Sequence, residues 1–385
     1  MRKVLVCKCD LLQYSETFIR EQVLAYASWK PVLIGLTKVP SGLPLDGLDV
    51  RLLENAAPTF FGTMYRRVLS ELNIPASHSV ARLRREAASL VHVHFATDAV
   101  IYWPIVRRLN LPVIVTLHGY DINIHREWWE RGFLGARARR YPKRLMSLSR
   151  QPRVHFVAVS EAIKQRAIAY EIPSDRIDVH YIGIDLRHFH SSGPSVIARR
   201  PRILFVGRLV EKKGGEFLIK AYARVRSKLP EAELVMVGDG PLFPQLVTLA
   251  SKLNVPVQFL GSVNAIEVKR QIDMARVFCL PSVTAENGDA EGLGIALLEA
   301  QACGVPVVTS ARGGATEGIV DGVTGFAFPE RDIDILSARL LRLLVDEELA
   351  LSMSRAGPTF IAEKFDIRHC TRSLERLYDA MTQAK

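Results

Sequence analysis

Two carboxylates in one short segment carry the clearest chemical signal of this chain. Glu291 and Glu299 lie on either side of a glycine-flanked helix start in EGLGIALLEA, where Gly292 and Gly294 free the backbone. Backbone amides at the start of a helix bind anions, and phosphate above all. A carboxylate just outside such an anion site is placed for hydroxyl groups or for developing positive charge. The segment therefore predicts a site for a phosphate-bearing sugar, such as a nucleotide sugar.

Each carboxylate also has a plainer interpretation. Glu299 could be a solvated helix residue, since it lies on a different face from the predicted buried stripe of Ile295, Leu298 and Ala302. Glu291 could be an ordinary acidic residue in the first turn of a helix. Neither interpretation explains why both carboxylates flank the same glycine-rich turn, so we favour a binding site.

A second cluster, FVGRLVEKKGG, has cations between a predicted strand and a predicted helix. Arg208 and Lys213 follow the strand and precede a helix that starts near the glycine pair 214–215. Arginine offers forked hydrogen bonds and lysine a mobile point charge, a combination suited to a diphosphate. The alternative is a solvated basic turn, which is the default interpretation for Lys212.

A histidine ends another predicted strand. His118 in LHGYD follows Val113–Leu117, and Gly119 lets the chain turn closely behind it. Such a histidine either approaches a ligand or satisfies backbone groups at the end of its strand. His92 and His94 alternate along the strand in VHVHF, and we interpret them as structural rather than as metal ligands.

The turn VGDGP, which contains Gly238, resembles part of a dinucleotide fingerprint. One short glycine turn is weak evidence for that function. We interpret it as a tight connection between a strand and a helix that lines the site.

Short apolar strands that could position these clusters alternate with helix-length segments over most of the chain. The predicted strands are 4–7, 31–35, 90–94, 113–117 and 155–159 in the first half, and 203–206, 233–237, 257–260, 277–280 and 305–308 in the second. Apolar strands separated by helices, such as the one expected over 215–229, are typical of parallel, doubly wound sheets. The predicted fold class is therefore α/β, with two Rossmann-like domains.

The segment 186–201 is rich in Ser, Gly and Pro and lacks periodicity, which predicts a linker. We place one domain at 1–185, a second at 202–362, and a C-terminal helix in 363–385 that could pack back on the first domain. Open α/β sheets bind ligands beyond the carboxyl ends of their strands. We therefore expect the clusters to meet in a cleft between the domains.

Composition agrees with an ordinary globular protein of this size. The chain has 385 residues, of which 48% are hydrophobic and 24% charged, a balance that argues against disorder. Residues 1–185 hold 26 Lys and Arg against 17 Asp and Glu, so most of the net charge of +11 lies in the first half. This favours an anionic partner there, such as phospholipid, lipid-linked phosphate or nucleic acid.

Three further features concern the environment of the chain. The five cysteines are scattered, so we expect free thiols rather than a metal site. The apolar run at the N-terminus is interrupted by Lys8 and Asp10, and no run approaches the ~18 residues of a membrane span. We expect a cytoplasmic protein, with attachment to the inner face of the membrane still open.

Five ordered motifs resemble those of glycosyltransferase family 4, whose members are retaining enzymes with the GT-B fold. The motifs are LHGYD, AVSEAIKQ, FVGRLVEKKGG, EGLGIALLEA with its E-x7-E pattern, and VDGVTGF. The resemblance covers nearly the whole chain. SETFI and the lead-in TAENGDAEG are similar to the subgroup that builds bacterial exopolysaccharide, colanic-acid-type polymers and lipopolysaccharide O-chains.

This resemblance implies transfer of a hexosyl group from a nucleoside-diphosphate sugar to a saccharide acceptor, expected to be lipid-linked, in cell-surface polysaccharide synthesis. It implies a role for each candidate residue: catalysis for His118 and Glu291; donor diphosphate binding for Arg208, Lys213, Leu293 and Gly294; donor sugar or ribose contacts for Glu291, Gly292 and Glu299; the base pocket for Gly238 and Val263; and the acceptor side for Ser15, Glu16, Thr17 and Asp121. No cofactor is expected. Because the diphosphate site is already cationic, no metal is expected either.

The chain departs from the family pattern after its first strand. Many members carry a glycine-rich loop there, whereas this chain has CDLLQYSETF. Ser15 to Thr17 are the candidates to replace the contacts of that loop.

A basic and aromatic segment follows at 126–150. Its membrane-contact candidates are Trp128, Trp129, Arg137, Arg139, Arg140, Lys143 and Arg144. A basic helix with aromatic residues is typical of membrane-surface binding. The alternative is a solvated basic face over a normal apolar stripe.

Three other functions compete with sugar transfer. The nearest is another GT-B activity, such as a nucleotide-sugar epimerase or a soluble sugar-phosphate transferase. A nucleic-acid binder would account for the basic first half, but no known DNA- or RNA-binding motif is present, so nucleic acid is not an expected partner. A Rossmann dehydrogenase is disfavoured because no G-x-G-x-x-G opens the first helix.

Overall fold

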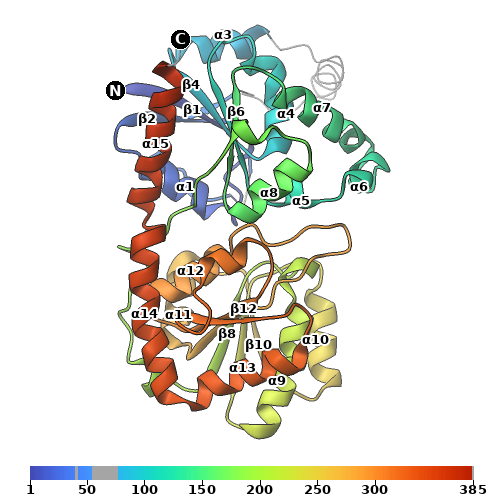
Figure 1. Ribbon diagram of the computed structural model, residues 1–385, viewed down its shortest axis with the longest axis vertical. Helices are drawn as coiled ribbons and strands as arrows, with labels where there is room; N and C mark the ends of the chain where they lie inside the picture. Colours follow the sequence, from blue (N-terminus) through green and yellow to red (C-terminus); the bar gives the residue numbers. More distant parts are fainter. Residues whose placement is uncertain (40–41, 54–76, 384–385) are drawn as a thin grey trace. The chain divides into compact units, whose positions relative to one another are not determined.

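The computed structural model describes residues 1–39, 42–53 and 77–383. The chain forms two compact units. Unit 1 comprises Met1–Gly183 and Ile367–Lys385, and unit 2 comprises Ile184–Asp366. The chain therefore leaves unit 1, completes unit 2 and returns to unit 1 with its last helix (Figure 1).

Unit 1 is built on a seven-stranded sheet in the order β3-β2-β1-β4-β5-β6-β7. Its strands are β1 Arg2–Leu11, β2 Trp29–Lys38, β3 Val50–Leu52, β4 Leu90–His94, β5 Val113–Leu117, β6 Val154–Ala158 and β7 Ile177–Val179. Every pairing is parallel. β4 and β5 are buried along their whole length, as nearly continuous apolar sequences predict. Their register sets His94 beside Thr116, so the ends of both strands lie side by side.

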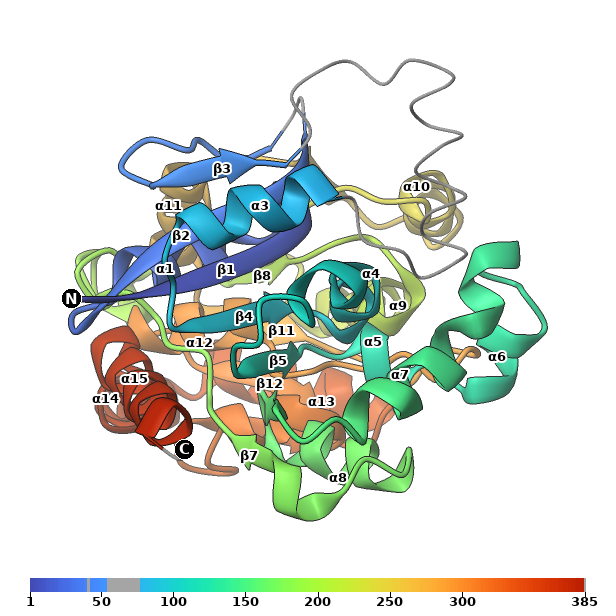
Figure 2. The ribbon, with the colours of Figure 1, turned by 90° about the horizontal axis from the view of Figure 1, so that it is seen from above.

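The helices of unit 1 pack on both faces of this sheet (Figure 2). They are α1 Thr17–Leu24, α3 Ser77–Arg85, α4 Ala96–Val106, α5 Tyr120–Asn123, α6 Arg126–Glu130, α7 Tyr141–Ser149, α8 Glu161–Ala169 and α15 Ile367–Gln383, with short 3₁₀ turns η1 Ala136–Arg140 and η2 Ser174–Arg176. α15 lies next to α1 and the start of β2 (Figure 1). Its buried Glu375 accepts hydrogen bonds from the amides of Ala27, Ser28 and Trp29 at 2.7–3.0 Å. These bonds attach the end of the chain to unit 1.

Unit 2 is built on a six-stranded sheet in the order β10-β9-β8-β11-β12-β13. Its strands, again all parallel, are β8 Arg202–Val206, β9 Glu233–Val237, β10 Val257–Gly261, β11 Val277–Leu280, β12 Val307–Ser310 and β13 Gly325–Phe328. Its helices are α9 Gly215–Lys228, α10 Phe243–Lys252, α11 Ala265–Met274, α12 Ile295–Ala302, α13 Ile333–Val345 and α14 Glu347–Phe365, with turns η3 Val196–Ala198, η4 Glu211–Lys213 and η5 Gly313–Gly318.

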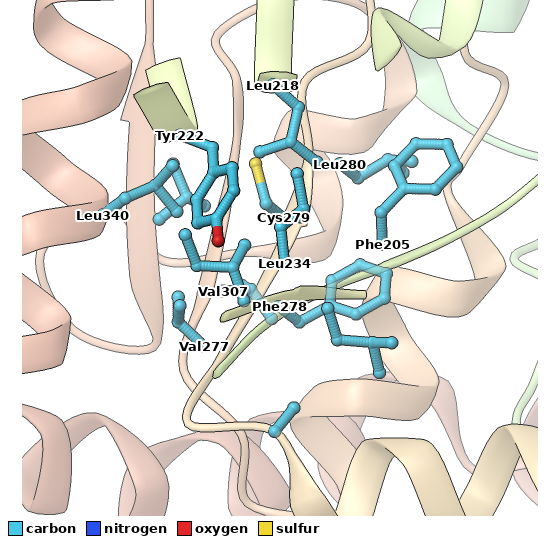
Figure 3. Close-up of a cluster of buried hydrophobic side chains, with 14 of the residues drawn as sticks. Phe205, Leu218, Tyr222, Leu234, Val277, Phe278, Cys279, Leu280, Val307 and Leu340 are labelled. Carbon is cyan, nitrogen blue, oxygen red and sulfur yellow. The ribbon is translucent and has the colours of Figure 1, made fainter. Parts of the chain in front are cut away.

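Part of the core of unit 2 lies between its sheet and the helices α9 and α13. Leu218 and Tyr222 of α9 pack over Cys279 of β11, and Leu340 of α13 closes the cluster (Figure 3). The buried hydroxyl of Tyr222 donates to the carbonyl of Ala232 at 2.9 Å, so its polar atom is satisfied inside the core. This packing holds the helix that begins at the predicted cation cluster.

The α/β class and the ten predicted strands are confirmed. The predicted bounds of β4, β5, β9 and β11 are exact, and the ends of the other six are shifted by one to a few residues. Val305 precedes β12 instead of starting it, because its amide caps the preceding helix at Ala300 and Pro306 has no amide hydrogen to share. Three strands were not predicted: β3, β7 and β13. All three are short and lie at sheet edges, where the apolar signal is weakest.

The chain passes from unit 1 to unit 2 at Gly183–Ile184 and returns to unit 1 at Asp366–Ile367. There the two ends of unit 2 lie side by side, with the Ile184 amide bonded to the Phe365 carbonyl at 2.7 Å. The segment 186–201 belongs to unit 2, because buried Arg199 donates to the carbonyls of Ile272 and Ala275.

Candidate functional site

The turn from β8 into α9 positions Lys213. Gly214 caps the helix in the left-handed region, with φ at +66°, and a Cβ there would lie 1.9 Å from the carbonyl oxygen of Pro281. Only glycine therefore allows this turn to lie directly against the end of β11. The Lys213 ammonium donates to Oε2 of Glu291 at 2.5 Å. The two predicted clusters are thus brought together inside unit 2.

Glu291 is buried and ion-paired. Besides Lys213, the hydroxyl of Ser282 donates to its Oε2 at 3.2 Å. Burial alone would raise the pKa of this carboxyl, but Lys213 and Lys212 and these hydrogen bonds outweigh burial and lower it. Glu291 is therefore an anion at neutral pH, held within reach of the start of α12.

The start of α12 presents free backbone donors. Gly294 caps the helix with φ at +80° and without a capping side chain. Within the described residues, the amides of Leu293, Gly294, Ile295 and Ala296 have no acceptor. Open amides at a helix start carry partial positive charge, so this turn can accept an anion.

Two of the predicted residues have polar groups without a partner. The Arg208 side chain is exposed, and no described residue pairs with it. Glu299 is half-buried and likewise lacks a hydrogen-bond or ion-pair partner in the described part of the chain. Removal from water raises the pKa of Glu299 to about 7. Both groups are free to contact a ligand.

Two loops proposed to border the base pocket lie next to the loop after β8, which carries Arg208 and Lys213. Gly238, with φ at +128°, would place a Cβ 2.0 Å from the Gly207 carbonyl oxygen, so a side chain is excluded there. Its amide bonds to the carbonyl of Gly261 at 2.8 Å. Val263 follows as a half-buried residue packed on the core. The loops after β8, β9 and β10 are therefore held side by side.

Three residues that support this site, Ser282, Lys212 and Asp289, were not predicted from the sequence. Ser282 bonds Glu291, and Lys212 forms an ion pair with Asp289 at 3.0 Å. Lys212, which was interpreted as a solvated residue, thus joins the loop after β8 to the segment before α12. Ser282 lies directly after β11, which was its only signal in the sequence.

In unit 1, His118 lies among rings at the end of β5. Its ring centroid is 4.4 Å from that of Phe95 and 5.0 Å from that of Phe18. Its Nε2 lies 3.0 Å from Nδ1 of His94. Burial first, and then the nearby His92 and Lys8, lower the pKa of His118 well below its usual value. His118 is therefore a neutral imidazole at physiological pH.

Asp121 supports the turn that carries His118. Its fully buried carboxylate accepts hydrogen bonds from the amides of His118, Gly119 and Ala96 at 2.9–3.1 Å. Burial raises the pKa of this carboxyl to about 6, against the opposing effect of these hydrogen bonds. Both carboxylate oxygens accept hydrogen bonds from backbone amides, so Asp121 stabilises the turn that carries His118.

The three residues from Ser15 to Thr17 differ in how much of each is exposed to solvent. Ser15 is exposed and Thr17 is half-buried at the start of α1, whereas Glu16 is buried. Glu16 pairs with the ammonium of Lys8 at 3.2 Å, and the same ammonium pairs with Asp98 at 3.0 Å. Glu16 therefore belongs to a buried ionic cluster, and Ser15 is the accessible member of the predicted set.

The basic segment after β5 combines exposed and buried rings. Trp129 is buried against Tyr141, while Trp128 packs on Phe133, which is 59% exposed. Arg139, Arg140 and Lys143 are exposed and Arg144 is half-buried, and the side chain of Arg137 lies outside what the structure describes. α6 lies at the edge of unit 1 in both views (Figure 2).

Two features are absent from the described residues, one that concerns membranes and one that concerns metals. No helix among them is both long and apolar enough to span a membrane. They contain no group of three or more His, Cys, Asp or Glu side chains placed to hold a metal ion. The five cysteines are free thiols, as expected.

Two known family patterns match this chain. The family described as "Glycosyl transferases group 1" matches residues 192–360, and "Glycosyltransferase Family 4" matches residues 49–188. The amylovoran biosynthesis glycosyltransferase AmsK of Erwinia amylovora is 30% identical over 81% of this chain and 75% of its own length.

A second relative matches over a shorter region. It is the GDP-mannose-dependent alpha-(1-6)-phosphatidylinositol monomannoside mannosyltransferase of Mycolicibacterium smegmatis, 37% identical over 48% of this chain and about half of its own length, 50%. Among solved structures, Anabaena Alr3699/HepE in complex with UDP and glucose superposes with a TM-score of 0.79 at 19% identity, covering 98% of this chain and 100% of that one. This likeness shows the GT-B fold.

Proposed function

Because the chain belongs to glycosyltransferase family 4, we propose that it transfers a hexosyl group from a nucleoside-diphosphate sugar to a saccharide acceptor with retention of configuration. The acceptor is proposed to be lipid-linked and part of a bacterial cell-surface polysaccharide. The names of its relatives support this function, since AmsK is named for amylovoran biosynthesis.

The observation that carries the proposal is the Lys213–Glu291 ion pair beside the open amides of α12. Glu291 bonds the Lys213 ammonium and lies just before the four free amides, so the ammonium and the amides come from two loops that this ion pair joins. The unpaired Arg208 follows the neighbouring strand. A diphosphate would compete with Glu291 for Lys213, because both are anions. Binding would then free the Glu291 carboxylate to contact a sugar hydroxyl.

These groups would act on the leaving group of the transfer. The bond from the anomeric carbon to the diphosphate breaks, and its electron pair goes to a phosphate oxygen. The acceptor hydroxyl oxygen bonds to the same carbon, and its proton passes to the departing phosphate. Arg208, Lys213 and the α12 amides stabilise the developing phosphate charge, which is the kind of fixed electrostatic environment that contributes most to catalysis.

The same cationic set supports transfer without a divalent metal. We expect turnover with a chelator present at the rate measured without it. A strict requirement for Mg²⁺ or Mn²⁺ would refute this part of the proposal.

A ligand panel tests the donor. Thermal midpoints would be measured with UDP- and GDP-hexoses, since the second relative is named for GDP-mannose and the structural neighbour holds UDP. A cognate donor at a hundred times its Kd stabilises the fold by about 2.7 kcal/mol. Product analysis by NMR would then give the anomeric configuration. Donor turnover that needs no acceptor would favour an epimerase instead.

The exposed face of the segment 126–144 is proposed to contact anionic membrane. Phe133 and Leu134 are 59% and 43% exposed, and Arg131, Arg139 and Arg140 in the same segment are exposed cations. Apolar side chains among cations suit the boundary between headgroups and acyl chains. Such contact would bring unit 1 to a lipid-linked acceptor.

Vesicle pelleting tests this surface. We expect binding to vesicles with phosphatidylglycerol, weakened by salt and by the F133S/L134S double substitution. Binding to neutral vesicles alone, or no binding at low salt, would contradict it. Lys30→Ser and Lys38→Ser, on the exposed ends of β2, are controls expected to bind as the wild type does.

A further inference from the structure

A second histidine contacts His118 from the neighbouring strand. His94 ends β4, and His118 follows β5, which pairs with β4 in parallel. His94 Nδ1 lies 3.0 Å from His118 Nε2, and the ring planes are 27° apart. The contact therefore joins one nitrogen of each ring in a single hydrogen bond.

One proton lies between these two rings. Burial lowers the pKa of His94 and of His118 well below the usual value, so both rings are neutral at physiological pH. Each neutral ring carries one N–H, and one of the two facing nitrogens must donate. Whichever donates, the outer nitrogens of the two rings then have opposite protonation states.

The outer nitrogen of His94 is shut inside unit 1. Nε2 of His94 is buried without a hydrogen-bond partner among the described residues. Oε1 of Gln22 is likewise buried and has no partner among them. Both residues line a cavity of about 10 Å³, which is the room that about one water molecule needs. The outer nitrogen of His94 is therefore out of contact with bulk solvent.

The outer nitrogen of His118, by contrast, is available. Its Nδ1 has no partner among the described residues, and the ring is half-buried. Phe95 packs against the ring from a left-handed backbone conformation, with φ at +69°. A non-glycine residue in this conformation costs free energy, and such strain gathers at functional sites.

We propose that His94 is a positioning residue that holds His118 in one ring orientation and one neutral tautomer. The outer nitrogen of His118 then meets its ligand in a fixed protonation state. The inference rests on the proposed function only in that the ligand is a sugar substrate. It gives a buried histidine, interpreted from sequence as structural, a part in setting turnover.

Two substitutions of His94 test this role in the full chain. His94→Asn keeps a polar atom near the position of Nδ1, whereas His94→Leu keeps volume and removes the hydrogen bond. Spectra of the 15N-labelled histidine rings would be recorded from pH 5.5 to 8. We expect one protonated and one bare nitrogen for His118 in the wild type and in His94→Asn. In His94→Leu we expect averaged signals of two exchanging tautomers.

Kinetics gives the second readout. His94→Leu should lower kcat about tenfold or more and change the donor KM less than about threefold, because it affects positioning and not donor binding. His94→Asn should recover most of kcat. His155→Asn, in the neighbouring β6, serves as the control and should leave both the His118 signals and kcat unchanged.

The outcomes separate the inference from the proposed function. Averaged tautomers in the wild type, or unchanged His118 signals and kcat in His94→Leu, would overturn the inference. The ring spectra of the wild type test it even if a substituted protein fails to fold. Absence of sugar transfer with a single wild-type tautomer would refute the function and leave the tautomer contact intact.

Discussion

The two units prepare their candidate residues in opposite electrostatic states. Unit 2 gathers charge: Lys213 and Glu291 form an ion pair at 2.5 Å, and Arg208 stays exposed and unpaired. In unit 1, His94 and His118 are neutral rings, and Phe95 packs against His118. The contrast supports the proposal that unit 2 binds the anionic part of a donor, while unit 1 offers a neutral hydrogen-bonding group.

The largest expected effect comes from removing charge in unit 2. Lys213→Ala should lower kcat/KM about 100- to 1000-fold, the loss typical when one group that stabilises a developing anion is removed. Lys220→Ala, on the exposed face of α9, is the matched control and should stay within about threefold. Full turnover by a Lys213→Ala, Glu291→Gln double variant would show that transfer does not depend on the charged pair of unit 2.

A smaller effect is expected in unit 1. His118→Ala should lower kcat about 10- to 100-fold, in the range for a positioned polar group. The thermal shift produced by the nucleoside diphosphate should not change, because that ligand is proposed to bind unit 2. A lost thermal shift would show that the division between the units is wrong.

Glu299 gives a prediction with a defined pH dependence. Its folded pKa is raised to about 7 from an ordinary value of 4.5, so the folded protein binds more protons than the unfolded chain between these values. Stability contributed by the protonated group is complete below about pH 4.5 and is lost as pH rises through 7. Glu299→Gln should raise the thermal midpoint at pH 8 by about 2–4 °C and leave it unchanged at pH 4.

The same substitution should weaken donor binding at pH 8, if Glu299 contacts ribose hydroxyls. Glu216→Gln, an exposed residue of α9, is the control and should show neither change. If Glu299→Gln raised the thermal midpoint equally at pH 4 and pH 8, burial of the charged carboxylate would not be the cause.

The smallest effect on activity is expected at Glu375. Glu375→Ala leaves the amides of Ala27, Ser28 and Trp29 without their acceptor, which should cost about 1–3 kcal/mol of unfolding free energy. Donor binding should not change, because these contacts lie within unit 1. Denaturant unfolding and a donor titration on the same sample would check both statements.

The sequence was a better guide to unit 2 than to unit 1. Arg208 and Lys213 lie between β8 and α9, and Glu291 and Gly294 lie just before α12, so in both places the reactive residue types and the glycines fall in one short stretch of sequence. The Lys8–Asp98 pair and the His94–His118 contact join residues that lie 90 and 24 positions apart in the chain. Pairing across a parallel sheet depends on strand order and register, which local periodicity does not encode. Edge strand β13 escaped prediction for a related reason, since a short strand has little pattern of its own.

The central claim is that Lys213 and the amides at the start of α12 together bind the donor diphosphate. The most direct measurement is calorimetric titration of the nucleoside diphosphate into the wild type, Lys213→Ala and His118→Ala. The account predicts that Lys213→Ala raises Kd at least tenfold, about 1.4 kcal/mol, while His118→Ala leaves Kd within twofold of the wild type, about 0.4 kcal/mol. Equal Kd values for Lys213→Ala and the wild type would contradict it.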